Sequence, residues 1–196
     1  MTGSDLRAVV VAGHTGDAET ARASLTSADP GVRAAALGAL ERLDALDADT
    51  VTAALGDAEM AVRRRAAELA ATHPSVDLLP VLDDPDDRVV EVAAWACGEH
   101  ESRRDAIVER LVELAGTAED PLVRESAVAA LGAIGDERGL AAIIAACSDK
   151  PAVRRRAVLA LAPFDGAEVE AAIERALVDR DWQVRQAAED LRRAQS

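Results

Sequence analysis

The sequence predicts an all-α protein in which helical hairpins stack into a solenoid. Six copies of a similar segment follow one another at spacings of 27 to 34 residues. Such a period is typical of repeat architectures. Hydrophobic residues make up 49% of the chain but aromatic residues only 2%, so Ala, Leu, Val and Ile must fill a core between closely packed helices. The six copies are anchored by Val32, Val62, Val89, Val123, Val153 and Val184.

The chain before the first anchor predicts a pair of short helices over residues 4–13 and 17–28, without the anchor signature. We interpret residues 1–28 as an N-terminal cap. The last repeat carries Glu189, Arg192 and Arg193 at otherwise apolar positions, as a polar C-terminal cap requires. We expect one domain over residues 1–196, a right-handed α-α superhelix whose repeats span residues 29–56, 57–83, 84–118, 119–148, 149–178 and 179–196.

Each anchor predicts the first helix of a hairpin, because small or apolar residues follow it by four, seven and eight positions and form one helical face. Aspartates near five of the starts suit the N-cap, and prolines near four of them suit the first turn. The expected caps are Asp29, Asp57, Asp120, Asp149 and Asp181, and the expected first-turn prolines are Pro30, Pro85, Pro121 and Pro151.

A second apolar-periodic run follows each anchored helix and predicts its partner. The expected second helices cover residues 48–56, 75–83, 103–116, 137–148 and 167–179. Pro80 should kink or shorten the second of these, because proline lacks the amide hydrogen of the helix interior.

The clearest copy reads DPLVRESAVAALGAIGD over residues 120–136, with an acidic start, "VR", paired alanines and "LG". This pattern resembles HEAT repeats of the short type named after bilin lyases, and the resemblance covers residues 29–194. The third copy departs from it, with Val90 in place of arginine. The resemblance implies an armadillo-like solenoid, a fold found in scaffolds, lyases, hydroxylases and DNA repair proteins.

Five arginines follow their anchor valines directly. We predict a structural ladder in which each binds an aspartate of an adjacent repeat; a row of anion-binding sites is the alternative. The five are Arg33, Arg63, Arg124, Arg154 and Arg185.

The formal net charge of -14 opposes binding to phosphate backbones, even with the arginine triplets 63–65 and 154–156. We expect no nucleic-acid partner. The longest N-terminal apolar run is AVVVA, too short for a membrane span, and Cys97 and Cys147 are too few for a disulfide framework. We therefore expect a cytoplasmic protein without membrane attachment.

Motifs for catalysis, cofactors or metals are not evident in the sequence, which favours a non-enzymatic role with no cofactor. Two histidines, His73 and His100, share a repeat position and should lie close together, either as helix C-terminal imidazoles or as a metal or pH-sensitive pair. His100 and Glu101 form one His-Glu pair of the kind that deoxyhypusine hydroxylase, a HEAT-family member, uses repeatedly for iron.

A partner-binding surface is predicted on the second helices, which we expect to line the concave side. An alanine strip should lie between two acidic ridges, formed by Ala141, Ala145, Glu109, Glu113, Glu170 and Glu174. Trp95 should be partly exposed, as an interface anchor or packed in a groove between helices. Trp182 should pack on the preceding repeat.

These features predict a scaffold or adaptor that binds a partner protein, such as one with a basic or amphipathic segment. One alternative is a lyase-like or chaperone-like protein that acts on a cofactor-bearing partner. Another is an oxidoreductase similar to deoxyhypusine hydroxylase.

Overall fold

The computed structural model describes residues 3–100 and 104–194, and every regular element in these ranges is a helix. The all-α fold is thereby confirmed. The elements are α1 (Gly3–Thr15), α2 (Ala18–Ser24), α3 (Pro30–Arg42), α4 (Ala48–Leu55), α5 (Met60–Ala70), the 3-10 helix η1 (Leu79–Asp83), α6 (Asp87–Cys97), α7 (Arg104–Thr117), α8 (Pro121–Ile134), the 3-10 helix η2 (Glu137–Gly139), α9 (Leu140–Ala146), α10 (Pro151–Ala160), α11 (Ala167–Leu177) and α12 (Trp182–Ala194).

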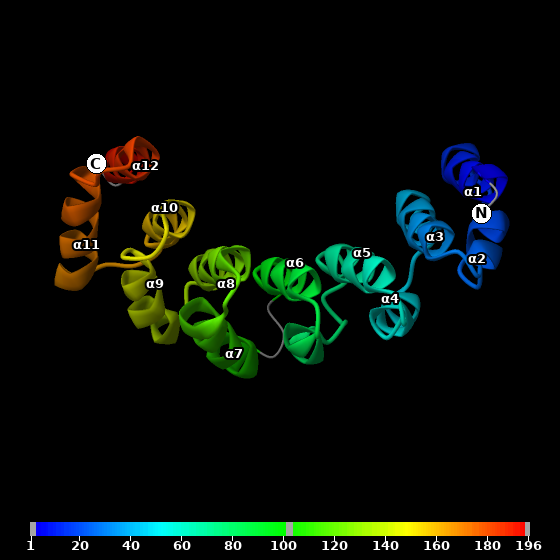
Figure 1. Ribbon diagram of the computed structural model, residues 1–196, viewed down its shortest axis with the longest axis horizontal. Coiled ribbons are helices and arrows are strands. Elements are labelled where there is room, and N and C mark those ends of the chain that lie inside the picture. The colour runs from blue at the N-terminus through cyan, green and yellow to red at the C-terminus, as the bar shows by residue number, and fades with distance from the viewer. Residues whose placement is uncertain (1–2, 101–103, 195–196) are drawn as a thin grey trace. The chain divides into compact units, whose positions relative to one another are not determined.

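The chain divides into two compact units, Met1–Ala93 and Ala94–Ser196, with the boundary inside α6. Each unit has two layers (Figure 1). In the N-terminal unit the anchored helices α3 and α5 lie beside α1, and α2 and α4 pack below them. In the C-terminal unit α8, α10 and α12 form the anchored layer, and α7, α9 and α11 form the layer of second helices.

The C-terminal unit bends with its anchored helices on the inner side (Figure 1). Small residues let these helices approach closely: a β-carbon on Gly132 of α8 would lie 2.6 Å from both Cα and Cβ of Ala160 of α10. The second helices occupy the outer side of this bend. The expectation that they line the concave side is therefore wrong in this unit.

Aspartates begin several anchored helices, as the sequence predicts. Asp29 and Asp120 are the N-caps of α3 and α8, and Asp181 accepts a hydrogen bond from the amide of Gln183 in α12. Two predicted caps differ, because Glu59 and Lys150 hold the N-cap positions of α5 and α10.

Prolines start α3, α8 and α10, but Pro85 lies two residues before α6 and so outside its first turn. The predicted helix 75–83 is reduced to η1 because Pro80 removes an amide donor. The predicted helix 137–148 is divided between η2 and α9. Residue 103, the expected start of α7, lies outside the described residues.

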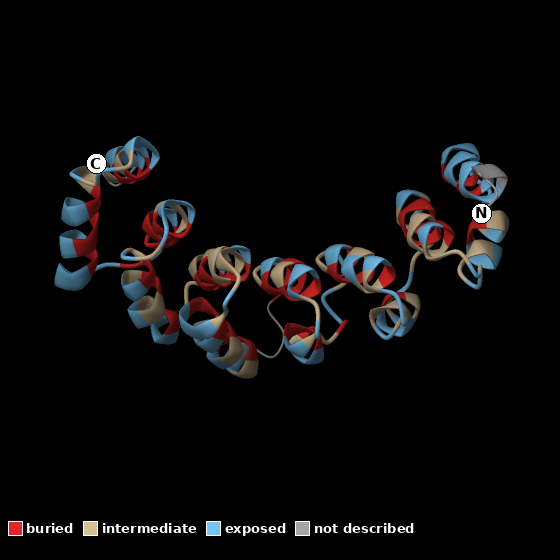
Figure 2. Cartoon of the chain, viewed as in Figure 1, coloured by how far each residue is buried: buried red, intermediate tan, exposed pale blue. Residues whose placement is uncertain are grey.

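Alanine and branched aliphatic residues fill the space between the layers, as the composition requires. The largest fully buried side chains include Leu40, Leu111, Leu131, Ile143 and Phe164. Figure 2 shows that buried residues face the interior of each hairpin stack while the outward faces are exposed. The functional surfaces are therefore the exposed sides of the two layers.

Candidate functional site

Four of the anchor arginines bind an aspartate of the next repeat with the same bidentate geometry. Nε and Nη2 of each arginine donate to the two carboxylate oxygens at 2.6 to 3.0 Å. The pairs are Arg33–Asp57, Arg63–Asp84, Arg124–Asp149 and Arg154–Asp179. The rungs of this ladder therefore join consecutive repeats within each unit.

Within a run of the ladder, one aspartate binds two successive arginines. The sequence did not predict this double role. Asp149 accepts from Arg124 with its carboxylate, and its backbone carbonyl accepts from Nη1 of Arg154 at 2.8 Å. Asp179 likewise joins Arg154 to Arg185, whose Nη1 donates to the Asp179 carbonyl at 2.7 Å. Each such residue thus fixes the turn that begins its own repeat and holds the preceding repeat.

Carboxylates in the ladder are held in their charged form. The hydrogen bond from Arg33 lowers the pKa of Asp57, and those from Arg124 and Arg154 lower the pKa of Asp149 and Asp179. Burial raises the pKa of Asp84, but the bonds from Arg63 and from a backbone amide outweigh burial, and its pKa is also lowered. The competing anion-binding interpretation is disfavoured for these four arginines, because each fork already holds a carboxylate.

The ladder is interrupted in the third repeat at both of its positions. Val90 replaces the arginine, and Ala118 stands five residues before the next anchor, Val123, at the position that Asp57 and Asp84 hold before their anchors. Val90 is buried as an apolar residue. The rungs therefore form two separate runs, one in each compact unit.

His73 binds the preceding repeat. Its Nε2 lies 3.0 Å from a carboxylate oxygen of Glu41, whose other oxygen accepts from the hydroxyl of Thr72 at 2.8 Å. His100 is buried and belongs to the other unit. Glu101, the second member of the His-Glu pair, lies outside the described residues.

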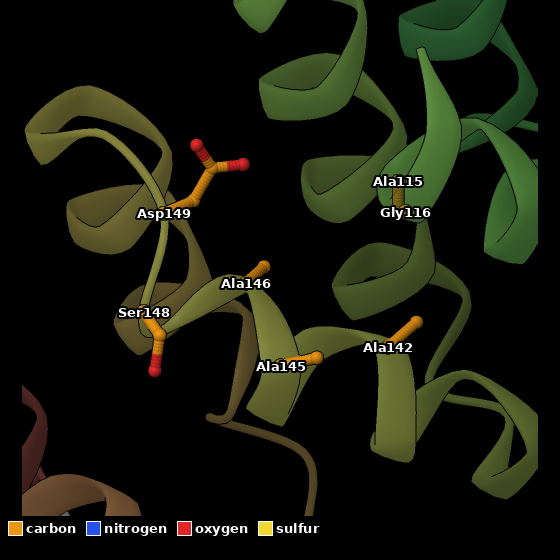
Figure 3. A pocket seen from close by; sticks show the side chains of 7 residues that line it. All are labelled: Ala115, Gly116, Ala142, Ala145, Ala146, Ser148 and Asp149. Atoms are coloured by element: carbon orange, nitrogen blue, oxygen red, sulfur yellow. The ribbon is translucent and has the colours of Figure 1, made fainter.

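A shallow hollow of about 260 Å³ lies between α7 and α9. It is lined by Ala115, Gly116, Ala142, Ala145, Ala146, Ser148 and Asp149 (Figure 3). The methyl groups of Ala142, Ala145 and Ala146 face the end of α7 at Ala115 and Gly116. Ala145 of the predicted alanine strip thus lines this hollow, and Ala141 is exposed on the same helix, α9.

The glutamates of the two predicted ridges are exposed, but they differ in the ion pairs that they already make within the protein. Glu109 makes no ion pair among the described residues, and Glu113 is bound by Arg110 of its own helix at 2.7 Å. Glu170 and Glu174 both contact Arg192 of α12, at 3.4 and 2.8 Å. Arg192 thus contacts both carboxylates of the second ridge, whereas in the first ridge Glu109 stays outside the Arg110–Glu113 pair.

Trp95 is 44% exposed, and it lies on α6 in the anchored layer rather than on the second helices. The structure therefore does not bring it together with the alanine strip. Trp182 is 65% exposed, so any packing on the preceding repeat covers only a small part of its side chain.

Residues 75–152 match the family model for HEAT repeats. This segment of the chain is therefore similar to HEAT repeats. Four of the six copies share the same arginine–aspartate contact.

Solved structures with the same fold are repeat proteins. An engineered protein aligns with a TM-score of 0.67 and 22% identity over 88% of this chain and 94% of its own. A designed armadillo repeat protein in complex with the peptide (KR)4 aligns with a TM-score of 0.60 and 18% identity over 98% of each chain. Human deoxyhypusine hydroxylase in complex with glycerol aligns at 0.50 and 18%, over 96% of this chain and 78% of its own. A search of curated proteins found no match.

The described residues offer neither a metal-binding cluster nor a membrane-spanning helix. Within residues 3–100 and 104–194, no three His, Cys, Asp or Glu residues are arranged to hold a metal ion. In the same ranges no helix combines the length and apolar character needed to cross a bilayer.

Proposed function

We propose that this helical-repeat protein is a non-catalytic scaffold that binds a basic segment of a partner protein in the hollow between α7 and α9. The observation that carries the proposal is a small-residue hollow at the end of α7 together with the exposed carboxylates of Glu109 and Glu113 earlier on the same helix. Alanine and glycine leave room for the backbone and side-chain stems of a ligand, and the carboxylates attract its cations.

Charge supports a basic ligand. The chain has a formal net charge of -14, and Glu109 has no ionic partner among the described residues. Glu113 is paired with Arg110, but an exposed pair within one helix is worth only about 0 to 1 kcal/mol, so a cationic ligand can exchange with Arg110 at small cost. Because Glu170 and Glu174 share Arg192, the proposal rests on α7 rather than α11.

The fold supports a binding role because helices held by repeated ladder contacts present their surface without ordering cost. A designed armadillo repeat protein with the same fold is in complex with (KR)4, a peptide of alternating basic residues. That complex supports a basic peptide as the probe for this chain.

The test is titration of the protein with the (KR)4 peptide by calorimetry at 50 and 150 mM salt. We expect saturable, salt-sensitive binding, and a tenfold or greater loss of affinity in the double variant Glu109→Lys, Glu113→Lys. The matched control is Glu19→Lys together with Glu168→Lys, the same charge change at exposed positions on α2 and α11. Equal losses in the two double variants would show non-specific attraction and overturn the proposed site.

A further inference from the structure

The anchored helices of the C-terminal unit carry an exposed apolar patch. The α7–α9 hollow, by contrast, lies in the layer of second helices. Trp95, Ala129 and Leu159 each lie six residues after an anchor, at the same register on α6, α8 and α10. Trp95 is 44% and Leu159 41% exposed, and Ala129 between them is half-buried. The equivalent positions in other repeats are Gly38, Glu68 and Asp190, so this row is apolar only here.

A second hollow of about 240 Å³ opens within this patch between α8 and α10. Its lining consists of small or apolar residues and one cation: Ala129, Gly132, Ala133, Leu159, Ala160, Ala162, Pro163 and Arg156. A space of about 150 Å³ already accepts a benzene-sized group, so this hollow has room for an aliphatic or aromatic side chain.

In the N-terminal unit, arginine side chains fill the space beside two small residues. A β-carbon on Gly13 of α1 would lie 2.6 Å from a guanidinium nitrogen of Arg42, and one on Gly38 of α3 equally close to Arg65. There the arginine of the next helix covers the glycine. In the C-terminal unit Arg156 instead lies 3.6 Å from Glu125 of α8, and the hollow beside Gly132 stays open.

The edge of this hollow is positively charged, in contrast to the chain as a whole. Among the described residues, Arg156 has no hydrogen-bond partner on Nε, which lies 3.6 Å from a carboxylate oxygen of Glu125. Arg155, next to it on α10, makes no ion pair among the described residues. An apolar hollow with two under-used guanidinium groups complements a ligand that is apolar on one face and acidic beside it.

We propose that this patch is a second docking site, which binds an amphipathic helix of a partner protein through leucine-like side chains, with a carboxylate of that helix bound to Arg156 and Arg155. The helix lies across α8 and α10, with one apolar side chain in the hollow between Leu159 and Gly132 and another against Trp95. This site does not depend on the proposed binding of a basic segment, because no residue is shared between the two hollows.

The experiment uses two synthetic 14-residue helical peptides that differ only in charge. The acidic probe is two copies of Glu-Ala-Leu-Ala-Gln-Ala-Leu, and the basic probe has Lys in place of Glu. Both place their leucines on one helical face. They are titrated at 150 mM salt into the Trp182→Phe protein, so that Trp95 is the only fluorophore of its kind.

The acidic probe should shift the Trp95 emission to shorter wavelength with saturation, and the basic probe should not. Leu159→Ala and Arg156→Glu should each weaken the acidic probe at least tenfold. Leu122→Ala, which removes an exposed leucine of α8 outside the hollow, should change the affinity for the acidic probe less than twofold. If circular dichroism shows that Arg156→Glu disturbs folding, Arg156→Gln replaces it, and this variant should also weaken binding of the acidic probe.

The absence of an emission shift with the acidic probe at millimolar concentration would overturn the proposal. So would equal weakening by Leu122→Ala and Leu159→Ala, or a Trp95 response to the basic probe alone. The variant Glu109→Lys, Glu113→Lys should leave the acidic probe unaffected, which separates the failure of this site from the failure of the α7–α9 site.

Discussion

At the scale of single residues, the ladder arginine makes two kinds of contact that only a guanidinium can combine. In Arg154, Nε and Nη2 hold the carboxylate of Asp179 while Nη1 holds the carbonyl of Asp149. The side chain is almost fully buried, so each lost bond leaves an unsatisfied partner. We expect Arg154→Ala to lower the free energy of unfolding by about 2 to 3 kcal/mol, measured by urea denaturation.

The matched control is Arg185, which occupies the same register in the last repeat. It donates through Nη1 to two turn carbonyls, and among the described residues its Nε and Nη2 hold no aspartate. Arg185→Ala should therefore cost less than Arg154→Ala. Arg154→Lys should recover only part of the loss, because lysine cannot form the bidentate contact. Equal losses for Arg154 and Arg185 would show that the inter-repeat pair contributes nothing.

Acid stability follows from the lowered pKa of the ladder carboxylates. Because the pKa of Asp149 is lower in the folded chain than its ordinary value, protons bind the unfolded chain more tightly. Its contribution is complete above about pH 4 and is lost as pH falls through the folded pKa. We expect stability to fall as the pH drops below about 4, and to fall less steeply in Asp149→Asn, as monitored by circular dichroism in urea at each pH.

At the scale of helices, the close approach of α8 and α10 depends on the absence of one methyl group. A β-carbon on Gly132 would meet the backbone and β-carbon of Ala160, which cannot move without moving α10. We expect Gly132→Ala to destabilise the protein by about 1 to 3 kcal/mol in thermal unfolding, despite the higher helix propensity of alanine.

Gly116 provides the control for this substitution. It lies in α7 and is not in a left-handed conformation, and a β-carbon added to it would meet no heavy atom within 4 Å. Gly116→Ala should be neutral or stabilising by up to about 1 kcal/mol. A stabilised Gly132→Ala variant would contradict the tight α8–α10 contact.

The same scale shows what the sequence could and could not predict. Periodic apolar positions and the anchors predict most helices closely, because a hairpin repeat sets its own period. The side of the bend was predicted wrongly, because it depends on helix spacing that Gly132 and Ala160 set together. The contact of Arg192 with the second ridge was not predicted, because Arg192 meets Glu174 from a separate helix, 18 residues away in the sequence.

At the scale of the whole molecule, stability in a repeat array is a sum over nearest neighbours. The rungs Arg33–Asp57 and Arg63–Asp84 belong to the N-terminal unit, and Arg124–Asp149 and Arg154–Asp179 belong to the C-terminal unit. Val90 and Ala118 supply neither member of a rung in the third repeat. The bidentate contacts therefore stabilise each unit separately.

This separation predicts that damage to one run of the ladder stays local. In native-state hydrogen exchange, Arg63→Ala should accelerate the exchange of amides in α1 to α5 while those of α8 to α12 keep their protection. Arg124→Ala should do the reverse, and it serves as the matched control because both arginines lose the same set of bonds. If the protein opened as one cooperative array, either variant would lower protection equally in both units, and the interruption at Val90 would have no energetic consequence.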